Sequence, residues 1–443
     1  HGGPPMPQLK VGAAKANVTP PVGCPMSGYA GRKHGAVGVH DDLFVRAFYL
    51  DDGQTPLAIV SCDLIDMCQT GMKLFEEVAA EQTGLPPEAL FIANSHTHSG
   101  PSTRYAEDSE LRSYIEALYA IISGAIYEAR EAMRPAALSI ARREVQCGVN
   151  RRERTADGAI ILGVNPDGPV DRHVDIFRFD DDSGEVIGVL LAHAVHNVTM
   201  GSDNYLISGD LGGAAEAFVE RNTGCIAGFL NGCCGNINAH PRGEFAHVDM
   251  LGARLGAAVV QGLTEAAAPT GDVTLGSLRH EVALPLDPVP PLEEAERDLK
   301  EAEALLGRAE HGEAEEELSV WRVKRIIDHA KARHELAAIG ETSASLTYEI
   351  AVVTMNDIAL VGYPSEVFFE IGEAVREGSP FGLTRPLSHV NGAHGYIPIR
   401  EAFADGGYEV TARIHHKGLG ITPDAGDALA EASLAALKKA KSF

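Results

Sequence analysis

Short apolar runs that stop abruptly at polar or glycine-rich blocks constrain the fold of this chain more than any other feature. Three have the length of buried strands and a fourth is longer: residues 90–94 (LFIAN), 225–232 (CIAGFLNG), 358–363 (IALVGY) and 186–196 (VIGVLLAHAVH). Stretches of helical character lie between them, at about 67–83, 108–133, 210–224 and 246–266. The alternation predicts an α/β protein whose mixed β-sheets are flanked by helices.

The chain length of 443 residues permits one large domain or up to three ordinary ones. We expect a single domain over residues 8–443, with a helical insertion at about 290–340. The insertion is rich in charged residues, and we interpret it as a solvated helical hairpin, broken near Gly312, that caps the molecule. The alternative interpretation is an element that binds a partner.

The charge and the apolar content exclude several classes of function. The net charge is -25 and no basic stripe offsets it, so binding to nucleic-acid phosphates is excluded. No run of about 18 apolar residues is present, so no transmembrane segment is predicted. The seven cysteines, an odd number, do not resemble a disulfide framework, and we favour the cytoplasm over secretion. Nothing in the sequence indicates an oligomeric state.

The strongest chemical signal is a pair of histidines in the segment SHTHSGP, residues 95–101. On an extended backbone His96 and His98 point to the same side. They follow a buried strand directly, and loops at strand ends often carry active-site residues. Two neighbouring imidazoles can form the start of a metal site. The alternative is that one histidine binds a metal at most and the other bonds to the backbone.

Three later segments offer further polar groups, although each has a purely structural alternative. In HAVHNVTM, His196 lies nearer the strand end than His193, and the two would lie on opposite faces of a continued strand. Glu366 follows another apolar strand and is expected in the first turn of a helix, where a carboxylate can simply cap the helix. Tyr396 and Tyr408 stand twelve residues apart in glycine-rich loops, where tyrosines normally only pack.

Taken in order, these segments resemble the neutral, non-lysosomal ceramidase family. The matching motifs are ANVTPPVGCPMSGYAGR, GVHDDLFVRAFYL, SHTHSGP, AVHNVTM followed by LISGD, YPSE and GYIP…GGYE. The resemblance implies the catalytic domain of that family, here a single zinc hydrolase domain. Because the chain ends soon after Tyr408, we expect a short member without the immunoglobulin-like domain that usually follows in the family.

The resemblance also implies a zinc site and a reaction. His96, His196, Glu366 and Tyr396 match the family residues that bind one Zn²⁺ ion. A metal-activated water would then attack an amide (N-acyl) bond. His98 and Tyr408 would donate hydrogen bonds to the tetrahedral oxyanion, and a histidine or Glu366 would act as the general base.

Two further residues concern the substrate, which the resemblance implies to be a small molecule or a lipid. Arg151, in GVNRR, resembles an arginine that contacts substrate in the family. Asn238 stands in GNINA, residues 235–239, where the family has Gly-Asp-x-Ser-Pro. Asparagine cannot act as a hydroxyl nucleophile, so a serine acyl-enzyme is excluded at this position. Asn238 could still form a hydrogen bond with the substrate amide.

Three hypotheses for the function follow. The leading one is a ceramidase-like zinc amidohydrolase of sphingolipid metabolism. The second is a hydrolase on the same scaffold that acts on a non-ceramide amide, an ester or a glycoside. The third is a non-catalytic metal-binding or scaffold protein, and the four retained ligand positions argue against it.

Overall fold

A computed structural model describes residues 9–104, 111–310 and 320–442 of the chain. Its largest sheet has eight strands in the order β12-β10-β9-β6-β1-β3-β4-β5. Their bounds are β1 Lys10–Asn17, β3 Phe44–Asp51, β4 Pro56–Cys62, β5 Leu90–Asn94, β6 Arg134–Glu144, β9 His173–Asp181, β10 Val186–His193 and β12 Ile226–Asn231. Strand β10 pairs with β12 in parallel, as β4 does with β5, whereas the other neighbours are antiparallel. The prediction of a mixed sheet is confirmed.

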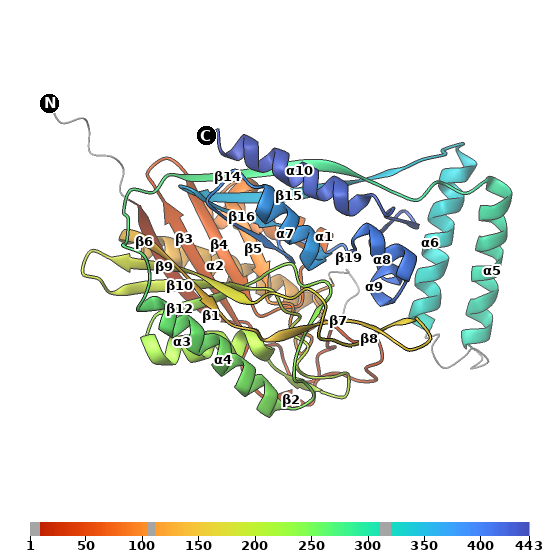
Figure 1. The fold of residues 1–443 in the computed structure, drawn as a ribbon. Helices are drawn as coiled ribbons and strands as arrows, with labels where there is room; N and C mark the ends of the chain where they lie inside the picture. Colours follow the sequence, from red (N-terminus) through yellow and green to blue (C-terminus); the bar gives the residue numbers. More distant parts are fainter. Residues whose placement is uncertain (1–8, 105–110, 311–319, 443) are drawn as a thin grey trace.

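Helices cover both faces of this sheet (Figure 1). They are α1 (Gln69–Thr83) and α2 (Arg112–Glu131) on one side, and α3 (Asp210–Thr223) and α4 (Phe245–Leu263) on the other. Two successive residues of β9 pack in different cores. Phe177 packs in the same core as Ile122 of α2, whereas Ile176 packs in the same core as Leu255 of α4. Neighbouring strand residues point to opposite faces, so the two helix pairs lie on opposite faces.

A second sheet lies beside the first and has four strands in the order β14-β15-β16-β18. Their bounds are β14 Leu275–Pro285, β15 Ser345–Met355, β16 Ile358–Gly362 and β18 Leu383–Leu387, and helices α7 (Phe369–Gly378) and α10 (Ala425–Ala440) pack against them. The chain after β18 joins the two sheets, since Leu387 bridges to Gly232 and Val390 bridges to Ala93. The carboxyl ends of β5, β12 and β18 therefore meet at one place.

The remaining elements are short. They are β2 Gly38–Val39, η1 Pro87–Ala89, β7 Gly148–Arg154, β8 Ile160–Asn165, β11 Leu206–Ile207, β13 Ile237–Ala239, β17 Glu366–Val367, β19 Tyr396–Ile397, α8 Arg400–Asp405, α9 Tyr408–Thr411, β20 His415–His416 and β21 Leu419–Gly420. Strand β13 pairs with β7, which pairs with β8. No helix in the described part of the chain combines the length and apolar content needed to cross a membrane.

The charged segment forms two helices, α5 (Leu292–Glu310) and α6 (Val320–Ala338), which stand at one end of the molecule (Figure 1). They pack on each other through a small apolar cluster that includes Ala302 and Ile327. Helix α6 reaches the body where the Arg333 guanidinium donates to the Gly418 carbonyl at 3.0 Å. These two helices lie in the segment predicted as a helical hairpin, and the predicted break near Gly312 lies outside the described residues.

Candidate metal centre

The first two histidines of the centre come from the loop that follows β5. His96 has a left-handed backbone conformation, with φ 64°. Its amide donates to the Leu64 carbonyl and its Nδ1 lies 2.9 Å from the Ile65 carbonyl oxygen. The His98 amide donates to the Asn197 carbonyl at 3.1 Å, next to the third histidine, His196. The loop is thus held at both histidines by backbone contacts.

His196 follows β10, which ends at His193. Its Nδ1 lies 2.7 Å from the carbonyl oxygen of Cys234. His193 takes no part in the cluster, because its Nδ1 contacts the His173 carbonyl oxygen at 2.9 Å instead. The sequence analysis expected only one of these two histidines to enter a shared site, and the structure places His196 there.

Glu366 and Tyr396 come from the two short strands β17 and β19, which pair in parallel with Glu366 directly opposite Tyr396. The expectation that Glu366 lies in the first turn of a helix is wrong, because α7 begins only at Phe369. Two residues of strand are too few to show an alternating pattern in the sequence. Pairing the two strands aims both side chains at the histidines.

The atoms that could bind a metal in His96, His196, Glu366 and Tyr396 converge. The Glu366 Oε2 lies 2.9 Å from the His196 Nε2 and 3.4 Å from the His96 Nε2. The Tyr396 hydroxyl lies 3.4 Å from the His196 Nε2. A tetrahedral ion with ligand bonds of about 2.0–2.2 Å separates its ligand atoms by about 3.3–3.6 Å. The observed separations are close to these values, so the four side chains have the spacing of a metal site.

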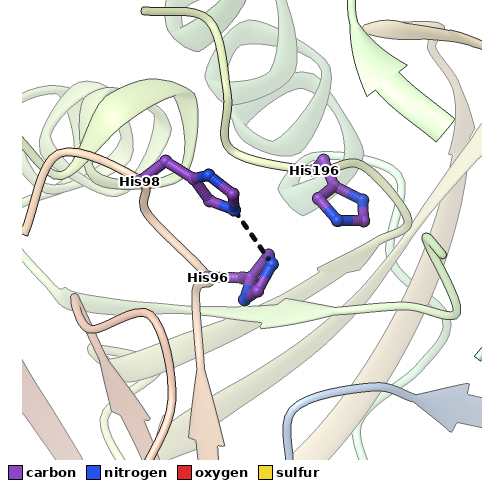
Figure 2. Close-up of side chains that lie close together, drawn as sticks. All are labelled: His96, His98 and His196. Carbon is purple, nitrogen blue, oxygen red and sulfur yellow. Dashed lines mark hydrogen bonds between the residues drawn. The ribbon is translucent and has the colours of Figure 1, made fainter. Parts of the chain in front are cut away.

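The orientation of the imidazoles also suits a metal. Because His96 and His196 each direct Nδ1 to a backbone carbonyl, the Nε2 atom of each ring faces the centre, where it can bind a metal once it carries no proton. Figure 2 shows the rings of His96, His98 and His196 turned toward one another. One nitrogen from each of the three lies within 4.8 Å of the others.

The protonation states fit as well. Burial alone would raise the pKa of Glu366, but His96 and His196 beside it outweigh that effect and hold the pKa well below its usual range. Burial lowers the pKa of His196 to about 4, and the charge of Arg151 acts in the same direction. At neutral pH the centre therefore holds a carboxylate and a neutral imidazole, which are the forms that bind metals.

His98 differs from the other two histidines. Its Nε2 lies 3.1 Å from the His96 Nε2, and within the described residues its buried Nδ1 has no hydrogen-bond partner. When the His96 Nε2 offers a lone pair, as a metal ligand must, His98 is the donor in this contact, with its proton on Nε2. A ring that directs an N–H at the centre is a hydrogen-bond donor there, not a metal ligand.

The remaining predicted site residues, Arg151, Asn238 and Tyr408, lie beside the centre. Arg151 donates from Nη1 to the Asn238 Oδ1 at 3.2 Å, and its guanidinium lies 5.2 Å from the centre of the Tyr396 ring. The Tyr408 ring meets the Tyr396 ring edge-on, with centroids 5.6 Å apart. Tyr396 is 5% exposed, whereas Tyr408 is 48% exposed. The structure thus brings all eight predicted site residues together.

Two residues of this region were missed by the sequence analysis. Glu409 is fully buried and accepts from the Arg151 Nε at 2.8 Å and from an Arg152 Nη1 at 2.6 Å. Its position next to Tyr408 in GGYEV was the available signal. His389 stacks on the His96 ring, with centroids 3.7 Å apart. A lone histidine in SHVNG carries no spacing pattern that would have identified it.

The chain matches a family model described as neutral/alkaline non-lysosomal ceramidase, N-terminal, over residues 9–247, which is more than half of its 443 residues. The matched region includes His96, His98, Arg151, His196 and Asn238. The residues that come later, among them Glu366 and Tyr396, lie beyond it.

Curated relatives agree with this match. The chain is 28% identical over 249 residues to the neutral ceramidase of Pseudomonas aeruginosa, an alignment that covers 52% of this chain and 37% of the relative. It is 30% identical over 213 residues to neutral ceramidase 1 of Arabidopsis thaliana, covering 44% of this chain and 27% of the relative. The aligned part thus spans well under half the length of the curated relatives.

The fold extends the likeness to nearly the whole chain. The crystal structure of the Pseudomonas aeruginosa neutral ceramidase matches 98% of this chain and 75% of its own, with a TM-score of 0.72 and 20% identity. A structure titled as ceramidase complexed with C2 matches with a TM-score of 0.71, 19% identity, and coverage of 98% and 76%. By fold, and by the match over residues 9–247, the chain belongs to the neutral/alkaline non-lysosomal ceramidase family.

Proposed function

We propose that this protein is a zinc-dependent hydrolase that cleaves an amide (N-acyl) bond. The observation that carries the proposal is the convergence of His96 Nε2, His196 Nε2, the Glu366 carboxylate and the Tyr396 hydroxyl at separations of 2.9–3.4 Å. Two imidazoles, one carboxylate and a phenol form a ligand set that zinc accepts. Family membership supports the amide-hydrolysing class.

A zinc ion held by these ligands supplies a Lewis acid and lowers the pKa of a coordinated water to about 7. The chain itself supplies the donors. With His96 serving as a ligand, the Nε2–H of His98 would donate to the oxygen of the substrate carbonyl. Tyr408, whose ring meets the Tyr396 ring edge-on, would donate a second hydrogen bond to the same oxygen.

Arg151 and Asn238 position the substrate. An arginine can only donate, so the contact at 3.2 Å fixes the Asn238 Oδ1 toward Arg151 and leaves the amide NH₂ group to donate elsewhere. Asn238 therefore offers the substrate an N–H and offers no nucleophilic oxygen. The attacking group in this proposal is water, and no acyl-enzyme forms at position 238.

The substrate we propose is an N-acyl compound with a lipid-like acyl chain, and ceramide is its first candidate because the relatives are named neutral ceramidases. A simple N-acyl amide, an ester or a glycoside remains a competing substrate on the same scaffold. We also propose that the described body is one catalytic domain, into which α5 and α6 are inserted between the paired strands β14 and β15.

The test combines metal analysis with a substrate panel. The purified protein is expected to hold about one equivalent of zinc and to hydrolyse N-acyl-sphingosine or a simple N-acyl amide, with activity lost to a chelator and restored by Zn²⁺. Turnover of only the ester or the glycoside would mean that the protein is a hydrolase of that bond and not of an amide bond. Less than half an equivalent of metal, together with no turnover, would favour a non-catalytic scaffold.

A further inference from the structure

The His389 side chain lies against the candidate metal centre without contributing a ligand to it. It is 2% exposed and comes from the segment after β18 that joins the two sheets. Its ring lies parallel to the ring of His96, with centroids 3.7 Å apart and an interplanar angle of 16°. The other neighbours of His96 in the cluster, His98 and His196, meet it edge-on instead, at 77° and 80°.

The stack covers one face of the His96 ring. The Nδ1 contact with the Ile65 carbonyl restrains that ring at one edge only, so the ring could still rotate about the axis through this contact. A second flat ring at van der Waals distance opposes that rotation, since tilting His96 would drive it into His389. The two contacts together set both the direction of the His96 Nε2 and the plane in which its lone pair lies.

The backbone of His389 ties together the segments that carry two other ligands. The carbonyl of His389 accepts from the amide and from the side chain of Asn94, at 3.0 and 2.9 Å, just before His96. Its amide donates to the carbonyl of Ser365 at 3.3 Å, just before Glu366. Its side chain reaches the Sγ of Cys234, with Nε2 at 3.6 Å.

Cys234 is the residue whose carbonyl orients His196. His389 also has φ 59°, a left-handed conformation that is costly for a residue with a side chain and that persists only where its surroundings enforce it. A single residue thus contacts or adjoins the segments of His96, His196 and Glu366.

We infer that His389 is a positioning residue, which holds the ring plane of His96 and keeps the three ligand segments in register for metal binding. The inference rests on the proposed metal centre. It predicts that the flat ring at position 389 matters more than its nitrogen atoms, because the stack on His96 uses the face of the ring.

The test compares His389→Phe, which keeps a flat ring, with His389→Leu, which fills the space without one. The matched control is His193→Leu, since His193 is also a buried histidine but lies outside the cluster. Zinc affinity is measured by competition with a chromophoric chelator, and thermal unfolding of the metal-free proteins is measured alongside. In the metal-free proteins, proton NMR follows the ring-current shift of His96 that the stack produces.

We expect His389→Leu to weaken zinc binding by about 10- to 100-fold and His389→Phe to stay within about threefold of the wild type, as for other residues that orient a ligand. The His96 shift should vanish only in His389→Leu, and His193→Leu should keep the zinc affinity. Equal zinc affinity in the Phe and Leu variants would overturn the inference. A wild type that binds no zinc would instead refute the metal centre, and an unchanged His96 shift in His389→Leu would refute the stack.

Discussion

His196 and Glu366 are 170 residues apart in the sequence, yet the Nε2 of the first lies 2.9 Å from the Oε2 of the second. His196 follows a strand of the large sheet, and Glu366 follows a strand of the second sheet. The contact therefore depends on how the two sheets meet. It places a carboxylate beside imidazole nitrogens, where a divalent cation could be bound by both groups.

The first prediction concerns that carboxylate. Glu366→Gln keeps the shape of the side chain and removes its charge, so zinc affinity should fall by about a hundredfold or more and hydrolysis should be lost with it. Competition with a chelator measures the affinity directly. Glu373→Gln, on the surface of α7, is the control and should bind zinc like the wild type. Undiminished zinc binding in Glu366→Gln would remove Glu366 from the ligand set.

The proposed ligands were predictable from the sequence to different degrees. His96 and His196 each follow a recognisable apolar strand, and the order of the motifs matched a known family. Glu366 lies beside His96 and His196, with which it was grouped, but it was assigned to the wrong element. A two-residue strand shows no periodicity, and the helix that follows it was predicted to begin too early.

Glu409 and His389 could not be identified for a different reason. Glu409 can be recognised only from its ion pairs with two arginines of β7, and His389 only from the stacking of its ring on that of His96. Contacts of this kind form between segments hundreds of residues apart, and neither local propensity nor motif spacing records them. The α/β class and most helix positions were predictable, because they depend on patterns within a single segment.

The second prediction separates the ligand role from the donor role at His98. Because its proton lies on the nitrogen that faces the centre, His98→Ala should retain zinc while the rate of hydrolysis falls by about 10²- to 10³-fold, as when an oxyanion donor is removed. The fall should appear in kcat. His96→Ala is the comparison and should lose both zinc and activity. Loss of zinc from His98→Ala would make His98 a ligand.

The third prediction concerns pH. Burial keeps His196 neutral in the folded chain, with a pKa of about 4 against an ordinary value of 6.5. Below pH 6.5 His196 binds a proton in the unfolded chain but not in the folded chain, so the metal-free protein loses stability as the pH falls. The contribution of His196 to the free energy of unfolding falls by about 2–3 kcal/mol between pH 7 and 4.5.

Urea unfolding of the chelator-treated protein at several pH values measures this loss. His196→Gln removes the titrating group and should flatten the dependence by that share, whereas His34→Gln, which changes an exposed histidine, should leave the slope unchanged. A slope that is the same in wild type and His196→Gln would show that His196 does not resist protonation in the folded chain.

The fourth prediction tests Asn238 as a donor to the substrate. Asn238→Ala removes the amide that lies between Arg151 and the site, so kcat/KM should fall by about 10-fold or more while zinc affinity is unchanged. Asn238→Asp keeps the size but replaces the N–H donors by oxygens, and it should be at least as impaired. Full activity in Asn238→Asp would show that the substrate takes no hydrogen bond from this position.

The fifth prediction concerns the buried charges around Glu409. This carboxylate is fully buried between Arg151 and Arg152, with hydrogen bonds of 2.8 and 2.6 Å. Glu409→Gln leaves two guanidinium groups without their counterion, which should lower the free energy of unfolding by about 3–5 kcal/mol. Denaturant unfolding measures the change, and Glu401→Gln, on the exposed side of α8, should cost far less.

Because Arg151 would lose its anchor, KM should rise in Glu409→Gln even where the protein is folded. A normal KM and a loss of stability below about 1 kcal/mol would mean that water or another group already balances these charges.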